Sequence, residues 1–151
     1  ALMMARLHGA TAYIVHMTCR EAVEALVRAK LEGQHCYGET CPQYLLLDDT
    51  VFTKPNFEAS QYVMSPPIRP GHQGHHDALW RGLANGMLDS VGTDHCPFTF
   101  EQKKMGLGDF TKIPNGAAGA RNASAASGSE GTSARNNSVR PHSNHSSARE
   151  L

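Results

Sequence analysis

Short apolar runs suited to strands alternate with segments of helical periodicity along much of this chain. The continuous apolar run at residues 11–17 is typical of a strand buried on both faces of a sheet. A helical pattern follows at residues 18–33, opening with the capping-box motif TCRE and stopping at a glycine. Further strands are predicted at residues 35–40 and 89–93, with a second helix at about residues 75–86 between them. This order, with one long proline-rich loop before the second helix, predicts an α/β fold.

Each predicted strand carries polar residues at its carboxyl end. In chain order these are His16, then Glu39 and Thr40, then Asp94. In a (β/α)8 barrel the carboxyl ends of the strands surround the active-site mouth, so this pattern favours a TIM-like barrel over a doubly wound sheet. A closed barrel needs about 200 residues or more. With 151 residues, this chain is predicted to form only a fragment of one.

His16 and Asp94 are the first candidates for a functional site. Imidazole and carboxylate groups are ligands of divalent metals such as Zn²⁺, and both residues are predicted at the same edge of the sheet. Each also has a simpler interpretation, because a histidine after a strand is often a hydrogen-bonded rim residue and an aspartate is often a helix N-cap. From position alone, both interpretations stay open.

Other polar residues have weaker claims to a function. His72, His75 and His76 resemble a metal cluster, but they lie in a Pro/Gly-rich connection into a helix, where solvated side chains are expected. Glu39 either supports a functional side chain or makes a structural hydrogen bond. His95 follows Asp94 and is expected either to orient it or to line the pocket.

The composition excludes several classes of function. The 14 basic and 14 acidic residues cancel, so no general attraction to nucleic acid or to an anionic membrane is expected. No apolar run approaches the roughly 20 residues needed to cross a bilayer, and the first residues make a poor signal peptide. The four cysteines form neither a CxxC pair nor a secreted disulfide framework. We therefore expect a reducing, cytoplasmic location.

The composition changes abruptly near residue 117. From residue 120 to residue 151, Ser, Asn, Ala, Gly and Arg dominate, and Val139 and Leu151 are the only large aliphatic residues. Such a segment buries too little apolar area to offset its loss of conformational entropy. We therefore predict a partial barrel at residues 1–119 and a disordered, low-complexity tail at residues 120–151. The abrupt onset of the tail suggests a frame shift or a misassembled gene end.

Several motifs between and around the strands are unusual for ordinary loops. They are YIVHMTCREA, YGETCPQYLLLDD, FEASQYVMSPPIR, LWRGLANG, VGTDHCPF and QKKMGLGDFTKIPNG. Together, and in this order, they closely resemble the C-terminal part of the barrel, about strands 6 to 8, of dihydropyrimidinases and D-hydantoinases in the amidohydrolase superfamily. Members of this family hydrolyse the cyclic amide bond of dihydropyrimidines or hydantoins to give N-carbamoyl amino acids.

The resemblance implies a role for four residues. His16 matches a histidine that binds one metal of a zinc pair, and Asp94 matches the aspartate that binds the other metal and shuttles the proton. Ser65 and Asn115 match positions whose main-chain groups hold the cyclic amide edge of the substrate. A planar ureide alternates N–H donors and C=O acceptors, which backbone groups on proline-stiffened loops can meet. Apart from the zinc pair, the resemblance implies no cofactor and no cofactor-binding residue.

The chain also departs from the family pattern. It has no HxH pair, and it lacks the strands that would supply the bridging carboxylated lysine and a further histidine. We therefore expect a truncated hydrolase that is inactive alone and binds at most one zinc ion weakly. The alternatives are a non-catalytic, scaffold-like relative, or an allantoinase- or dihydroorotase-type enzyme. The resemblance further implies a small cyclic ureide as substrate and, for full-length relatives, a homotetramer.

Overall fold

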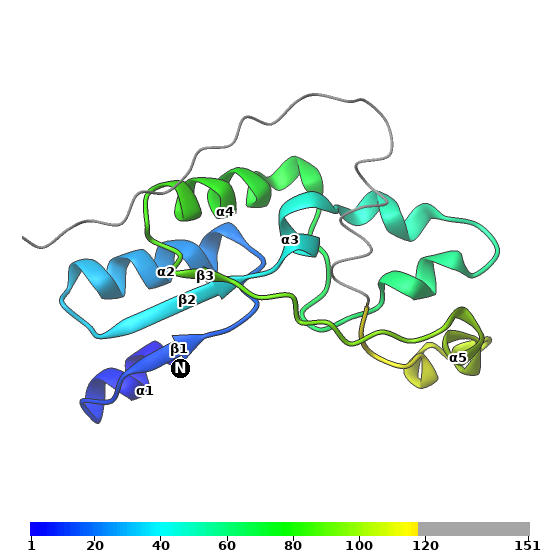
Figure 1. Ribbon diagram of the computed structural model, residues 1–151, viewed down its shortest axis with the longest axis horizontal. Coiled ribbons are helices and arrows are strands. Elements are labelled where there is room, and N and C mark those ends of the chain that lie inside the picture. Colours follow the sequence, from blue (N-terminus) through cyan, green and yellow to red (C-terminus); the bar gives the residue numbers. More distant parts are fainter. Residues whose placement is uncertain (118–151) are drawn as a thin grey trace, which may run out of the picture.

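A three-stranded parallel sheet forms the centre of the computed structural model, which describes residues 1–117 (Figure 1). Its order is β1 (Ala12–Ile14), β2 (Cys36–Thr40) and β3 (Ser90–Val91), so the middle strand is also the second in the chain. β1 pairs with β2 from Ala12 opposite Cys36, and β2 pairs with β3 from Glu39 opposite Ser90. The predicted tail lies outside the described residues. The α/β class and the predicted order of strands and helices are confirmed.

Two amphipathic helices, α2 (Arg20–Leu31) and α4 (His75–Ala84), lie side by side on one face of the sheet (Figure 1). Their apolar side chains form the core with residues from the strands and the loops. Its most deeply buried members include Met17, Leu26, Cys41, Leu79 and Leu88. Gly38 in β2 allows the close approach of α2, because a Cβ at this position would lie 2.3 Å from Leu26 Cδ2.

The remaining elements are short. The helices are α1 (Leu2–Leu7), α3 (Pro42–Leu46) and α5 (Phe100–Lys103), and the 3₁₀ turns are η1 (Asp49–Thr53), η2 (Glu58–Tyr62), η3 (Gly71–Gln73), η4 (Lys104–Gly106) and η5 (Phe110–Lys112). Most of them lie in the long connection between β2 and α4 or in the segment after β3. The sequence predicted no helix at α3 or α5. Within the described residues, no helix is both long and apolar enough to cross a membrane.

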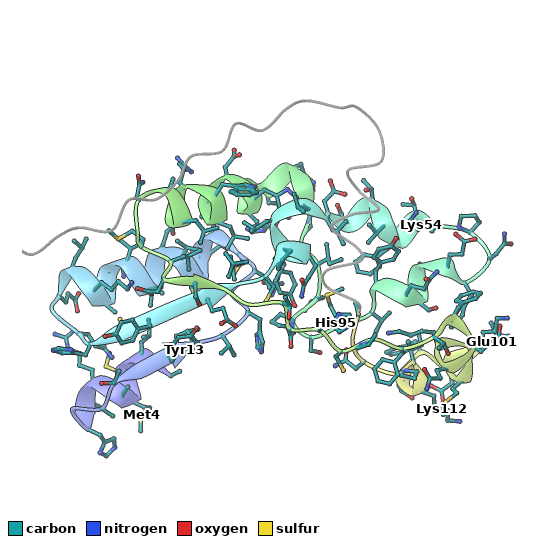
Figure 2. The ribbon with its side chains drawn as sticks, viewed as in Figure 1. Met4, Tyr13, Lys54, His95, Glu101 and Lys112 are labelled. Atoms are coloured by element: carbon teal, nitrogen blue, oxygen red, sulfur yellow. The ribbon has the colours of Figure 1, made fainter. Side chains whose placement is uncertain are left out.

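The face of the sheet opposite α2 and α4 is not covered by other described residues. Tyr13, Val15, Tyr37 and Val91 are each between 43% and 51% exposed, and Figure 2 shows Tyr13 on the side away from the two helices. The prediction that the first strand is buried on both faces is therefore wrong for this part of the chain. The apolar sequence of this strand is typical of burial on both faces, but the described residues cover only the face that packs against the helices.

The start of α2 differs from the predicted capping box. Cys19, not Thr18, is the N-cap residue, and it makes no side-chain cap hydrogen bond. His75 fills this role from the neighbouring helix, because its Nδ1 accepts from the Arg20 backbone N–H at 3.2 Å. Its Nε2 lies 2.9 Å from Gln73 Oε1 and donates to that oxygen. His75 is buried, so the prediction of a solvated residue is wrong at this position.

We expect His75→Ala to lower the free energy of unfolding by about 1–2 kcal/mol, because it removes a helix cap and leaves a backbone N–H unpaired. Urea unfolding of the full chain, followed by far-UV circular dichroism, measures this loss. The matched control is His72→Ala, since His72 is exposed and its loss should change the unfolding free energy by less than about 0.5 kcal/mol. Equal effects of the two substitutions would contradict the capping role.

Candidate functional site

His16 and Asp94 both follow the carboxyl end of a strand at the same edge of the parallel sheet. Hydrogen bonds beside them continue the strand pairing, from Met17 N to Glu39 O at 2.7 Å and from Gly92 N to Thr40 O at 3.0 Å. His16 is partly buried and Asp94 is exposed. The structure therefore places both residues where the sequence predicted them.

The backbone is strained at both candidate ligands. His16 has a φ of +38° and Asp94 a φ of +43°, a region that residues other than glycine seldom adopt. Such a conformation costs on the order of 1 kcal/mol or more, and it persists where the surrounding structure holds it. Strain of this kind is concentrated at functional sites. Asn56 and Phe57 also have positive φ values, so four residues other than glycine share this conformation in the described part of the chain.

A pocket of about 150 Å³ brings three of the four predicted site residues together. Ser65, Asp94 and Asn115 all line it. The remaining lining residues are Gln43, Met64, Cys96, Gly116 and Ala117. His16 does not line this pocket. His95, next to Asp94, lies between the sheet and α5 in Figure 2 and is not among the lining residues.

The two loops that carry Ser65 and Asn115 are joined directly. Asn115 Nδ2 donates to Ser65 Oγ at 2.9 Å, and Gly116 N donates to Val63 O at 3.0 Å. Gly116 has a φ of +152°, and a Cβ there would lie 2.6 Å from Cys96 O. Only glycine therefore fits where the Asn115 segment packs against the segment that follows Asp94.

Buried side chains of α3 hold these loops in place. Tyr44 Oη donates to Pro66 O at 2.9 Å, next to Ser65, and burial raises the pKa of the Tyr44 phenol. Gln43 Nε2 donates to Thr93 O at 3.4 Å, next to Asp94. The motif around these two residues, ETCPQYL, therefore supports both sides of the pocket from α3.

Lys103 is a supporting residue that the sequence reasoning missed. Its side chain is almost fully buried, and its Nζ donates to the backbone oxygens of Val63, Pro114 and Gly116. Burial lowers the pKa of the Lys103 ammonium below its ordinary value. No local signal separates Lys103 from Lys104, its exposed neighbour in the sequence.

One thiol, that of Cys41, and one further carboxylate, that of Glu39, lie in the region of Asp94. Burial, followed by the charges of Asp94 and Glu39, raises the pKa of the Cys41 thiol to about 12, so it stays protonated at neutral pH. The Glu39 carboxylate accepts from Tyr13 Oη at 2.8 Å and from Ser90 Oγ at 3.3 Å. Glu39 thus joins all three strands on the uncovered face of the sheet.

The metal-binding potential of the described residues is limited. Within residues 1–117, no group of three or more His, Cys, Asp or Glu side chains is arranged to hold a metal ion. Catalytic zinc sites use three protein ligands as a rule. His16 and Asp94 are donors of the right chemical kind, but two donors fall short of such a site.

Comparison with known proteins finds no matching family model but many similar sequences. The D-hydantoinase of Geobacillus stearothermophilus is 49% identical over 117 residues, which are 77% of this chain and 24% of that protein. The dihydropyrimidinase of Arabidopsis thaliana is 45% identical over 120 residues, which are 79% of this chain and 22% of that protein. This chain therefore spans about a quarter of the length of these curated relatives.

Solved structures give the same result for the fold. A crystal structure of dihydropyrimidinase from Brevibacillus agri NCHU1002 superposes with a TM-score of 0.74 and 49% identity, covering 78% of this chain and 25% of that one. A crystal structure of D-hydantoinase superposes equally well, with a TM-score of 0.74 at 48% identity and the same coverage. The α/β arrangement of the described residues is thus the one that these proteins have in the matching region.

Proposed function

Because this chain belongs to the D-hydantoinase and dihydropyrimidinase family, we propose that it forms one sector of the active site of a cyclic-amide hydrolase. The reaction adds water across a ring C–N bond of a dihydropyrimidine or hydantoin and yields an N-carbamoyl amino acid. The pocket lined by Ser65, Asp94 and Asn115 is the observation that carries this proposal. The sheet and its helices would then be the strand 6 to 8 region of a (β/α)8 barrel.

Within this sector, Asp94 is the proton carrier. Its carboxylate lines the pocket and is exposed, so it can accept a proton from the attacking water. The same carboxylate then returns that proton to the ring nitrogen as the C–N bond breaks. Bound Zn²⁺ would supply a more acidic attacking water and a polarised substrate carbonyl.

Ser65 and Asn115 hold the substrate ring. Their segments face each other across the pocket and are fixed by the Asn115–Ser65 hydrogen bond. Main-chain N–H and C=O groups held in this way can pair with the alternating donors and acceptors of a ureide at little cost in ordering. His16 and Asp94 would contribute the two metal donors of this chain, with the other ligands coming from outside it.

The chain alone is expected to be inactive. Two metal donors do not hold a zinc pair. In addition, the face of the sheet opposite α2 and α4 is not covered by other described residues. In a complete protein, we propose a cytoplasmic homotetramer that acts on a small cyclic ureide and contacts neither nucleic acid nor membrane. A non-catalytic, scaffold-like role stays the alternative if the complete protein lacks the other metal ligands.

A chimera tests the proposal. The matching segment of this chain replaces the corresponding segment of the Geobacillus stearothermophilus D-hydantoinase, and zinc content and hydrolysis of hydantoin and dihydrouracil are measured. We expect the chimera to bind zinc as the parent does and to keep kcat within about a hundredfold of it, while the 151-residue chain alone shows no turnover. A folded, zinc-loaded chimera without turnover would contradict the proposed function. Robust turnover by the chain alone would contradict its expected inactivity.

A further inference from the structure

The ammonium group of Lys103 is enclosed by backbone carbonyl groups. Its Nζ donates to Val63 O at 3.0 Å, to Pro114 O at 2.5 Å and to Gly116 O at 2.7 Å. It also lies 5.4 Å from the centre of the Phe98 ring. An ammonium has three N–H donors and no acceptor, so these three bonds use its whole capacity. Lys103 therefore has no donor left for a substrate and no lone pair for a nucleophilic role.

The three carbonyl groups belong to the two loops that line the pocket. Val63 precedes Ser65 by two residues, and Pro114 and Gly116 are the direct neighbours of Asn115. Val63 O also accepts from Gly116 N at 3.0 Å, and Asn115 Nδ2 bonds to Ser65 Oγ. The ammonium thus ties both loops together.

A lysine is suited to this position for a reason of geometry. Three backbone oxygens that converge from different directions need three donors on one centre, and an ammonium supplies them. A methionine of similar length would leave the buried carbonyl groups of Pro114 and Gly116 without a donor, at a cost in desolvation, while Val63 O would keep only its bond from Gly116 N. Relief of that cost requires the two loops to move apart and admit water.

We propose that Lys103 is a positioning residue for substrate binding, whose ammonium sets the spacing between the Ser65 loop and the Asn115 loop. This inference rests on the proposed function, because it assumes that main-chain groups of both loops hold the cyclic amide. It predicts a defect in substrate binding when Lys103 is lost, with the chemical step little changed. Lys103 touches no reacting atom in this proposal.

The experiment uses the zinc-loaded chimera with Lys103→Met and, as a matched control, Lys104→Met. Lys104 is the neighbouring lysine, and its side chain is 43% exposed and pairs with Glu101. We expect Lys103→Met to raise KM for dihydrouracil at least tenfold, with kcat per zinc-loaded enzyme changed less than threefold. Lys104→Met should change neither constant more than about twofold.

Chemical rescue provides a second variant in case Lys103→Met folds poorly. In Lys103→Ala, propylammonium replaces the missing part of the side chain and should lower KM toward that of the unsubstituted chimera. Tetramethylammonium has no N–H donor and should not. No rescue by propylammonium, together with a folded variant, would overturn the positioning role.

Amide hydrogen exchange on the same chimera separates a local effect from a general one. Lys103→Met should speed exchange at Gly116 N at least tenfold and leave Met17 N and Gly92 N, which bond to β2, unchanged. Equal acceleration at all three amides, or a fall in kcat with unchanged KM, would mean a purely structural role and overturn the inference. If the unsubstituted chimera shows no turnover, the proposed function is contradicted. If that chimera is active and Lys103→Met leaves its KM unchanged, only this inference is contradicted.

Discussion

Replacing Asp94 by asparagine in the chimera is expected to lower kcat for cyclic-amide hydrolysis by about 10²–10⁴-fold, the range that general acid–base groups contribute. Asparagine keeps the shape of the side chain and an oxygen in the pocket, but it cannot accept and return a proton at neutral pH. The loss should therefore fall on kcat, with a smaller change in KM. Steady-state kinetics with dihydrouracil and hydantoin measure both constants.

Zinc content per chain must accompany these kinetics, because Asp94 is also a proposed metal donor. A variant that keeps full zinc and loses turnover assigns the effect to proton transfer, whereas loss of both assigns it to metal binding. Asp109→Asn is the matched control. Asp109 accepts from Thr111 N at 3.2 Å and pairs with Lys112 away from the pocket, so kcat should stay within about twofold. Retention of more than a tenth of kcat by the zinc-loaded Asp94→Asn variant would contradict the proton-carrier role.

Gly38→Ala is expected to lower the free energy of unfolding by about 1–3 kcal/mol through overpacking. The new Cβ would lie 2.3 Å from Leu26 Cδ2 and 2.8 Å from Met17 Sδ, so α2 must shift away from β2 or both side chains must leave their positions. Urea unfolding of the full chain, followed by fluorescence of its single tryptophan, Trp80, measures the change.

The double variant Gly38→Ala/Leu26→Ala provides the control for this clash. Leu26 is fully buried, so Leu26→Ala alone should cost about 2–5 kcal/mol. If the clash with Leu26 is the cause, the new methyl group fills part of the cavity, and the double variant should be more stable than the sum of the two losses predicts. Strictly additive losses would show that the added methyl group acts through another contact.

The predictability of this fold varied with the range of the interactions involved. The strand and helix order followed from periodicity, and the end of α2 followed from Gly33, whose φ is positive. The start of α2 did not, because its capping group is His75, 55 residues away in the chain. Local sequence cannot distinguish a histidine that is free in solvent from one that a distant helix end requires.

In the pocket, too, the residues in recognisable local motifs were predicted and those that depend on distant contacts were not. Asp94 was found from its position after a strand, Ser65 and Asn115 were found through the family resemblance of the motifs that contain them, and the structure brings all three together. Lys103 was missed because a lysine in a polar segment, next to a second lysine, resembles a solvated one, and its three acceptors come from segments up to 40 residues away. The close approach at Gly38 was equally invisible, since it depends on how α2 lies on β2.

The positive φ angles of His16 and Asp94 have a consequence for the evolution of this chain. Glycine adopts such angles without a steric penalty, so a glycine at either position would relax the backbone and remove the donor atom in one step. Selection for a stabler protein and selection for these two side chains therefore act in opposite directions at these positions. If related sequences keep His16 and Asp94 at these positions, this would indicate selection for the two side chains, because selection for folding stability alone would favour glycine.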